Sequence, residues 1–258
     1  MAIARLLLME RFLANNQRIQ RLMEFASHGT DSWKSAEAAS DNVHADLYRA
    51  VIVFLHAMFE DMLRTAAHAR FLAARVKKSQ SMGVRGAPRV KQVKQFIERS
   101  VEGDLRRKSF SSCADVKKVL RQMGLDTTPF EPLFPDLKQM MEWRHRIVHK
   151  ADLPSRWARV PLQWTVDDNY KLLFSVMAVH AFCAALTVSD DPTDEPARWW
   201  LAKFTEAIGR AKQIYNALAD AELLAGSQKA PGSLMKTLGL PSSREEAEAM
   251  WEQRKTSN

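Results

Sequence analysis

The sequence predicts an all-α protein, and two observations favour that fold class. Apolar side chains recur at helical spacing in several long segments, and the 258 residues include only 9 glycines and 10 prolines, most of which fall between those segments. Because sheets need frequent turns, a chain so poor in turn-forming residues is expected to be mainly helical. Hydrophobic residues make up 46% of the chain and charged residues 26%, as in globular proteins that bury a substantial core.

The N-terminal part of the chain predicts three helices. The first covers residues 2–27 and ends near Gly29, and a polar stretch separates it from the longest helix, at 43–77. A basic loop with two glycines and a proline leads to a short basic helix at 89–101. The apolar stripe of the longest helix predicts its core face, formed by Leu47, Val51, Phe54, Leu55, Met58 and Met62.

Capping residues delimit the helices in the middle of the chain. Ser111 and Ser112 are expected to cap a further helix that Gly124 ends. A proline-punctuated loop then precedes Pro135, which can open a new helix at its first position with Asp136 favourable to the positive end of the helix dipole. This helix is expected to run to about residue 150 and to stop before Pro154.

The C-terminal part predicts two more helices and a tail. Thr165 and the aspartates after it are expected to cap a helix that runs through Val188, and the acidic linker SDDPTDEP separates it from a helix at 196–224. The tail, 225–258, contains one short charged helix. The predicted organisation is a helical domain at 1–190, with its core at about 40–188, and a helical C-terminal extension at 191–258.

The chain carries no convincing targeting segment. The N-terminal apolar run Leu6–Met9 is four residues long and is followed at once by Glu10 and Arg11, unlike a signal peptide. No stretch approaches the roughly 18 apolar residues that cross a bilayer. Two cysteines are too few for a disulfide framework or a cysteine metal site. We therefore expect a cytoplasmic protein with no membrane partner.

Positive charge is concentrated in one region. The net charge is +8, and residues 75–121 hold 14 lysines and arginines against 4 acidic residues. Such a surplus is typical of a surface that binds a polyanion, and Arg106, Arg107 and Lys108 are its densest cluster. A solvated helix face would give the same pattern and remains the alternative.

The segment MMEWRHRIVHK, residues 140–150, places basic and titratable side chains in an amphipathic helix. On a helical wheel the apolar residues around it lie within about 60° of Arg144, so Arg144 is expected at the centre of the buried stripe. A buried guanidinium needs a carboxylate partner. We expect Glu60 to be that partner, with Asp61 as the alternative.

His145 and His149 lie one turn apart on an edge of the same helix. An imidazole can donate or accept a proton close to neutral pH, and an arginine can hold a phosphate through two hydrogen bonds. One helix supplies few such groups for phosphodiester cleavage. A two-fold axis would bring two sets into one cleft.

The residues Arg144-His145-Arg146-Ile147-Val148-His149 resemble the Arg-polar-three variable-His motif of HEPN domains. The surrounding LKQMMEWRHRIVHKAD and the upstream FLHAMFEDML are similar to those of RiboL-PSP-like and related bacterial HEPN ribonucleases. The resemblance covers roughly residues 40–188. His145 stands where asparagine is commonest in the family, which keeps a polar residue at that position.

The resemblance implies an up-and-down HEPN-like bundle and a metal-independent endoribonuclease that needs no cofactor and acts as a homodimer or higher oligomer. On this interpretation His149 transfers the proton, Arg144 clamps the phosphate, and His145 positions the substrate or His149. Glu60 holds Arg144. The residues expected to guide the RNA backbone are Arg146, Lys150, Arg106, Arg107 and Lys108.

Bacterial ribonucleases of this kind act as toxins or effectors in phage defence and toxin–antitoxin modules, so the resemblance also implies a restraint on activity. An antitoxin or other partner protein, an inactive oligomer, and occlusion by residues 191–258 are the three alternatives.

Other interpretations of the motif remain open. Arg144 and Glu60 would also suit a purely structural ion pair, and the two histidines would suit solvated positions near a helix end. His145 and His149 with Glu142 form a conceivable zinc ligand set. The competing class of function is a non-catalytic helical adaptor that binds nucleic acid or a protein through residues 75–121.

Overall fold

The structure is a bundle of long helices, which confirms the predicted all-α class. The computed structural model describes residues 8, 10–23, 40–81, 87–150, 165–188 and 195–220, and these ranges contain no strand. Residues 10–23 are helical. The other elements in chain order are α2 (Ser40–Ser81), α3 (Ala87–Arg106), α4 (Cys113–Gln122), the 3₁₀ helix η1 (Thr128–Leu133), α5 (Phe134–Lys150), α6 (Val166–Val188) and α7 (Glu195–Asp220).

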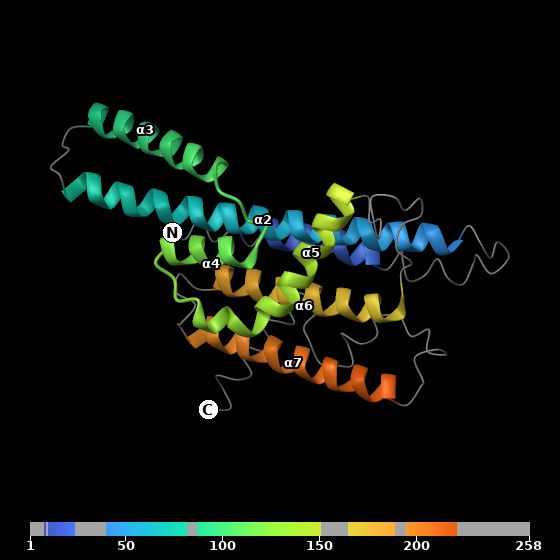
Figure 1. The fold of residues 1–258 in the computed structure, drawn as a ribbon. Helices are drawn as coiled ribbons and strands as arrows, with labels where there is room; N and C mark the ends of the chain where they lie inside the picture. The colour runs from blue at the N-terminus through green and yellow to red at the C-terminus, as the bar shows by residue number, and fades with distance from the viewer. Residues whose placement is uncertain are drawn as a thin grey trace.

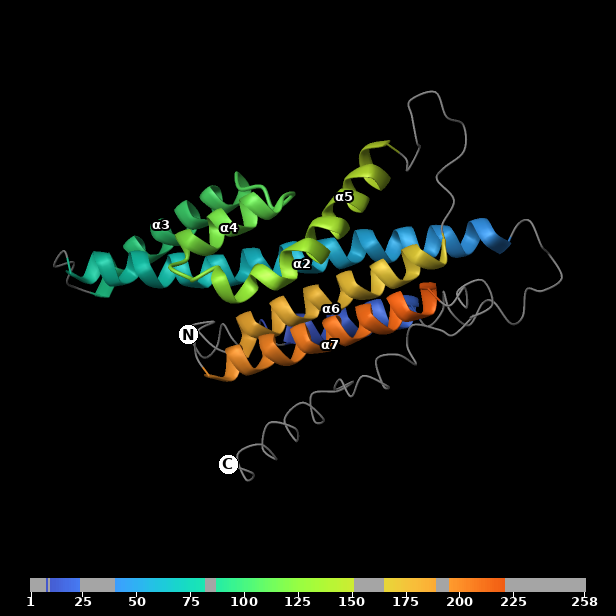
Figure 2. The same ribbon diagram turned by 60° about the horizontal axis from the view of Figure 1, so that its bottom comes forward.

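The longest helix, α2, organises the other elements. Figures 1 and 2 show α3 folded back along the C-terminal half of α2, while α6 and α7 lie side by side and α5 crosses α2 near its middle. Helix α6 packs against α7, α5 and α2, and η1 contacts α5, α6 and α7. The core therefore lies where α2, α5, α6 and η1 meet.

Three phenylalanines form the centre of this core. Phe182 on α6 contacts Phe59 on α2 in an edge-on arrangement, with ring centroids 5.0 Å apart, and Phe130 on η1, with centroids 4.5 Å apart. All three side chains are fully buried. Each ring comes from a different element, so burial of this cluster joins α2, η1 and α6.

The predicted core face of α2 is confirmed with one exception. Val51, Leu55, Met58 and Met62 are buried and Leu47 is partly buried against the core, whereas Phe54 is 54% exposed. At 100° per residue Phe54 lies about 70° from the centre of the stripe, which puts its side chain beyond the edge of the helix packing. The prediction that Phe54 belongs to the core is therefore wrong.

The caps of α4 follow the sequence prediction. Ser112 has extended backbone angles, and its Oγ accepts a hydrogen bond from the Asp115 backbone N–H at 3.2 Å. Gly124, just past the end of the helix, has a φ of +74°, a left-handed conformation that glycine adopts without steric cost. The proline-rich segment after it differs from the predicted loop, because residues 128–133 form the 3₁₀ helix η1.

The starts of α5 and α6 also agree with the capping signals. Pro135 and Asp136 occupy the first turn of α5, which runs to Lys150. The Thr165 Oγ1 accepts from the Asp168 N–H at 3.2 Å, and the Asp168 carboxylate accepts from the Thr165 N–H at 2.9 Å. This reciprocal pair begins α6, which ends at Val188 as expected.

Helices α2 and α3 are longer than the sequence predicts. The prediction ended α3 at residue 101, ahead of Gly103, but the helix continues to Arg106. Past Gly103, the Asp104 carboxylate accepts hydrogen bonds from Arg75 on α2 at 2.5 Å and from Arg107 at 2.6 Å. These tertiary contacts hold the last turn of α3 in spite of the poor helix propensity of glycine.

Helix α7, which the sequence assigns to the C-terminal extension, packs into the same core as the rest of the bundle. Trp200, Leu201 and Phe204 on α7 are buried in the common hydrophobic cluster. Residues 24–39, 82–86, 151–164, 189–194 and 221–258 lie outside the described residues, and they include most of the predicted connections and the whole of the predicted tail at 225–258 with its short helix.

Helix α6 contains the longest apolar stretch of the described residues that meets the criteria for crossing a membrane. Residues Asp167–Thr187 are long and apolar enough to cross a membrane by length and composition, so the expectation that no stretch reaches that length is wrong. Most of this stretch is buried among the other helices, and a buried core helix meets the same criteria.

Removal of the Phe182 ring tests whether the three-ring cluster is the centre of the fold. We expect Phe182→Ala to lower the free energy of unfolding by about 3–5 kcal/mol, because it leaves a cavity lined by Phe59 and Phe130. Phe54→Ala, the same truncation at an exposed position, is the matched control and should change it by less than about 0.5 kcal/mol. Urea titrations at equal protein concentration measure both, and equal losses would contradict the assignment of the core.

Candidate functional site

Helix α5 is held at its N-terminal end and presents the Arg144–His149 motif at the other end. The Asp136 carboxylate binds the Lys212 ammonium of α7 at 2.8 Å, and the Ser175 Oγ of α6 donates to the Asp136 carbonyl at 3.1 Å. Figures 1 and 2 show the last turns of α5 extending from the packed helices beyond the crossing with α2. The fixed start of α5 therefore sets the direction in which the motif points.

Arg144 and His149 contact each other at this end of α5. The Arg144 Nη1 lies 3.4 Å from the His149 Nε2. A guanidinium has only donors, so a hydrogen bond at this contact has the His149 Nε2 as its acceptor. At 3.4 Å the bond is long and weak, and a phosphate oxygen would be a better acceptor for the guanidinium. An anion that binds the Arg144 guanidinium would therefore leave the His149 imidazole nitrogen without this contact.

His145 lies beside His149, with ring centroids 4.8 Å apart and the rings tilted by 46°. Both histidines are exposed, and Arg144 is half-buried rather than central to the buried stripe. Arg146 is also half-buried, and the side chain of Lys150 lies outside the described part of the chain. The structure therefore brings Arg144, His145 and His149 together on a solvent-accessible edge.

The predicted ion pair between Glu60 and Arg144 is not formed among the described residues. The Glu60 Oε1 accepts from the Arg64 Nη2 at 2.7 Å, since Arg64 lies one turn further along α2. The alternative partner, Asp61, accepts from Arg11 in the N-terminal helical segment at 2.9 Å. Both carboxylates are thus taken by arginines that the prediction did not consider.

The residue that sequence reasoning missed is His56, one turn before Glu60 on α2. Its side chain is 4% exposed, and its Nε2 has no hydrogen-bond partner among the described residues. Burial lowers the pKa of His56, the positive charge of Arg144 lowers it further, and Glu60 and a hydrogen bond to the Phe110 backbone oppose this. His56 is therefore a neutral buried base close to Arg144. In the sequence, its i, i+4 spacing to Glu60 indicates that both side chains lie on the same face of the helix.

Arg64 follows His56 and Glu60 at one-turn spacing along α2 and holds the segment between α3 and α4. Its guanidinium donates to the Leu105 carbonyl at 2.6 Å and to the Lys108 carbonyl at 3.2 Å, and it lies over the Phe110 ring at 4.7 Å. The same segment supplies the Phe110 backbone group that bonds His56. His56, Glu60 and Arg64 thus link the motif on α5 to the end of α3.

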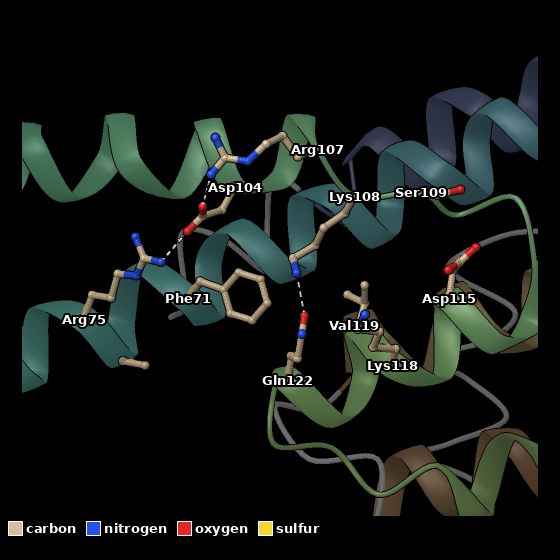
Figure 3. A pocket seen from close by; sticks show the side chains of 11 residues that line it. Phe71, Arg75, Asp104, Arg107, Lys108, Ser109, Asp115, Lys118, Val119 and Gln122 are labelled. Carbon is tan, nitrogen blue, oxygen red and sulfur yellow. Dashed lines mark hydrogen bonds and ion pairs between the residues drawn. The ribbon is translucent and has the colours of Figure 1, made fainter.

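The predicted RNA-binding residues of this segment lie at an open cavity away from the motif. Arg107 and Lys108 line a pocket of about 640 Å³ formed by α2, α3, α4 and the α3–α4 segment (Figure 3), and Arg106 is exposed at the end of α3. The Lys108 Nζ donates to the Gln122 side chain at 2.6 Å. The structure therefore separates these cations from Arg146 on α5.

The structure does not assemble the conceivable zinc set. Glu142 lies 3.6 Å from the Lys138 ammonium on the exposed side of α5. In the ranges that the structure describes, no group of three His, Cys, Asp or Glu side chains is placed to hold a metal ion.

Comparison of the chain with protein-family models, with curated proteins and with solved structures finds no significant match to any of them. The geometry of the site is therefore the basis for a functional proposal.

Substitution of His56 tests its state as a neutral buried base. Because its pKa in the folded protein lies below the unfolded value of 6.5, the unfolded chain takes up a proton first as the pH falls. His56 thus contributes full stability above about pH 6.5 and loses it on acidification, by at most about 1.4 kcal/mol per pH unit.

We expect His56→Asn, which keeps a short side-chain donor but cannot titrate, to lose less stability than the wild type between about pH 7.5 and pH 5. Denaturant titrations across this range measure the difference. Above about pH 7.5 the gap between the two proteins should be constant, which serves as the internal control. Parallel curves over the whole range would rule out a depressed pKa at His56.

Proposed function

We propose that this protein is an endoribonuclease whose active site is built around Arg144 and His149. The observation that carries the proposal is the 3.4 Å contact between the Arg144 guanidinium and the Nε2 of His149 on an exposed helix end. An arginine can stabilise the negative charge of the transition state and an imidazole can transfer a proton, and both are used when RNA is cleaved by its own 2′-hydroxyl.

The reaction follows from these two groups. The scissile phosphate replaces His149 as the acceptor of the Arg144 hydrogen bonds, and His149 Nε2 takes the proton of the adjacent 2′-hydroxyl. The 2′ oxygen then bonds to phosphorus while the bond from phosphorus to the 5′ oxygen breaks, and the leaving oxygen takes up a proton. The products are a 2′,3′-cyclic phosphate and a 5′-hydroxyl. Arg144 stabilises the extra negative charge of the transition state.

The leaving oxygen needs a second proton carrier, and a second copy of the chain would supply it. A two-fold axis near the end of α5 would place two motifs on one phosphate, with His149 of each copy as base and acid. The projection of α5 and the 47% exposure of Val148, between His145 and His149, support such a contact. His145 has the role of orienting His149 through their ring contact.

The resemblance to HEPN domains supports the same function. The Arg144-to-His149 motif lies at the C-terminal end of α5, a helix that crosses the longer α2. If the protein acts as the HEPN ribonucleases do, it is a cytoplasmic toxin or effector of phage defence or of a toxin–antitoxin module. Its activity is then restrained by a partner protein or by its own assembly. Arg146 and Lys150 would guide the RNA backbone beside the motif.

Incubation of purified protein with total RNA tests the nuclease assignment. We expect cleavage without added metal, fragments that end in a 2′,3′-cyclic phosphate, and no cleavage of DNA. His149→Ala should lower the rate by at least about 10³-fold because the proton acceptor is lost. Arg144→Lys should lower it by about 10²-fold because a lysine cannot form the two parallel hydrogen bonds.

Arg210→Lys is the matched control, since Arg210 is an exposed arginine on α7, and it should cleave as the wild type does. Unchanged thermal melting of the variants would show that they fold. RNA binding without cleavage in every protein would instead favour the non-catalytic adaptor that binds through residues 75–121.

Mixing the wild type with the His149→Ala variant tests the composite site. A mixed dimer keeps only one of the two His149 side chains that the composite site uses as base and acid, whereas a site contained in one chain would stay complete in the wild-type subunit. After exchange of subunits in an equal mixture, about one quarter of the dimers carry two wild-type chains, so we expect about one quarter of the activity of the undiluted wild type. Retention of about half of that activity would place the whole site within one chain.

A further inference from the structure

The pocket between α2, α3 and α4 is built around positive charge. Arg75, Arg107, Lys108 and Lys118 line it, against the two carboxylates of Asp104 and Asp115. Lys118 is exposed and makes no ion pair or hydrogen bond with the residues described. The cavity thus has a positive balance and one cation that is not engaged by the protein.

The two arginines of the pocket are held in place before any ligand arrives. Asp104 accepts from Arg75 at 2.5 Å and from Arg107 at 2.6 Å, and Arg75 also donates to the Ser100 hydroxyl at 2.7 Å. Hydrogen bonds from the two arginines, chiefly Arg75, keep the pKa of Asp104 below its usual value, so the carboxylate stays charged and fixes both guanidinium groups. Pre-organised guanidinium groups bind phosphate with a lower entropic cost than mobile ones.

An aromatic ring lies among these cations. Phe71 of α2 is half-buried and lines the pocket, and Figure 3 shows its ring between Arg75 and Lys108. The Lys108 Nζ lies over this ring at 5.8 Å from its centroid, at the outer limit of a cation–π contact. An aromatic side chain beside fixed cations is the arrangement that proteins use for single-stranded nucleic acid, where the base contacts the ring and the phosphate contacts the cations.

We propose that this pocket binds one nucleotide of an RNA strand, at a distance from the phosphate that is cut. Arg107, Lys108 and Lys118 contact the phosphate, and the nucleoside lies against Phe71. A volume of about 640 Å³ falls in the range of small-ligand sites and accommodates one nucleotide. The choice of an RNA strand as the source of this nucleotide rests on the proposed function.

The chain connects the pocket to the candidate site. Lys108 and Ser109 line the pocket, and the next residue, Phe110, provides the backbone group that bonds the buried His56 beside Arg144. On this proposal, a strand that extends from the pocket to the motif on α5 follows the α3–α4 segment. The pocket adds affinity and selects among substrates without taking part in the reaction.

Binding measurements in a cleavage-deficient background separate this proposal from the proposed function. Fluorescence anisotropy of the His149→Ala protein with a labelled single-stranded RNA of about 16 nucleotides gives the affinity directly. We expect the additional change Lys118→Ala to weaken binding about 5- to 10-fold and to reduce the slope of log affinity against log salt by about 0.7, the value for one lost phosphate contact on a single strand. Phe71→Ala should weaken binding about 10-fold.

Lys203→Ala is the matched control, because Lys203 is an exposed lysine on α7 that does not line the pocket, and it should change the affinity less than about twofold. An equal effect of Lys118→Ala and Lys203→Ala would overturn the proposal. Competition with adenosine monophosphate distinguishes the source of the nucleotide. If Lys118→Ala weakens this competitor and leaves RNA binding unchanged, the pocket takes a free nucleotide and the RNA proposal fails.

The two proposals fail separately. If Lys118→Ala loses RNA affinity and the wild type does not cut RNA, the pocket proposal is supported and the nuclease proposal is contradicted. If the wild type cuts RNA but its RNA affinity does not depend on Lys118 and Phe71, the nuclease proposal is supported and the pocket proposal is contradicted.

Discussion

The guanidinium of Arg64 makes the contacts on which the arrangement of α2, α3 and the segment between α3 and α4 depends. It binds Glu60 within α2, donates to the carbonyls of Leu105 and Lys108, and covers the ring of Phe110. These carbonyls lie at and just beyond the C-terminal end of α3, where backbone acceptors have no partner inside the helix. A single side chain therefore satisfies the end of one helix, neutralises a carboxylate and anchors the segment that leads to α4. Loss of Arg64 would leave Glu60 and both carbonyls without this partner.

Because the α3–α4 segment is held in this way, two regions with different chemistry share one support. On one side of Arg64 the segment carries Lys108 into a pocket rich in positive charge. On the other side Phe110 bonds His56, whose buried ring lies close enough to Arg144 to feel its charge. The same segment therefore borders the proposed nucleotide pocket and contacts the buried histidine on which the charge of Arg144 acts.

Local signals in the sequence predicted most of the helices, whereas the contacts between side chains of different helices could not be predicted from it. Ser112, Gly124 and Thr165 act on their own neighbours, so their positions alone indicate where helices begin and end. The continuation of α3 past Gly103 depends on Arg75 of another helix, and no local pattern reveals that contact. The partner of Glu60 was mispredicted for the opposite reason. Glu60 instead binds Arg64, four residues away on the same helix, and the charge of Arg144 acts on the buried His56.

Because α2 is one uninterrupted helix, it fixes the distance between the candidate catalytic pair and the pocket. His56, next to the candidate catalytic pair, and Phe71, in the pocket, are fifteen residues apart on one continuous helix, which corresponds to about 22 Å along its axis. A stacked strand advances about 3.4 Å per nucleotide, so this distance corresponds to about six or seven nucleotides. Under the two proposals, an oligonucleotide shorter than this would reach the pocket or the candidate catalytic pair but not both. Because a continuous helix is stiff, the length of the substrate would then affect how well it binds.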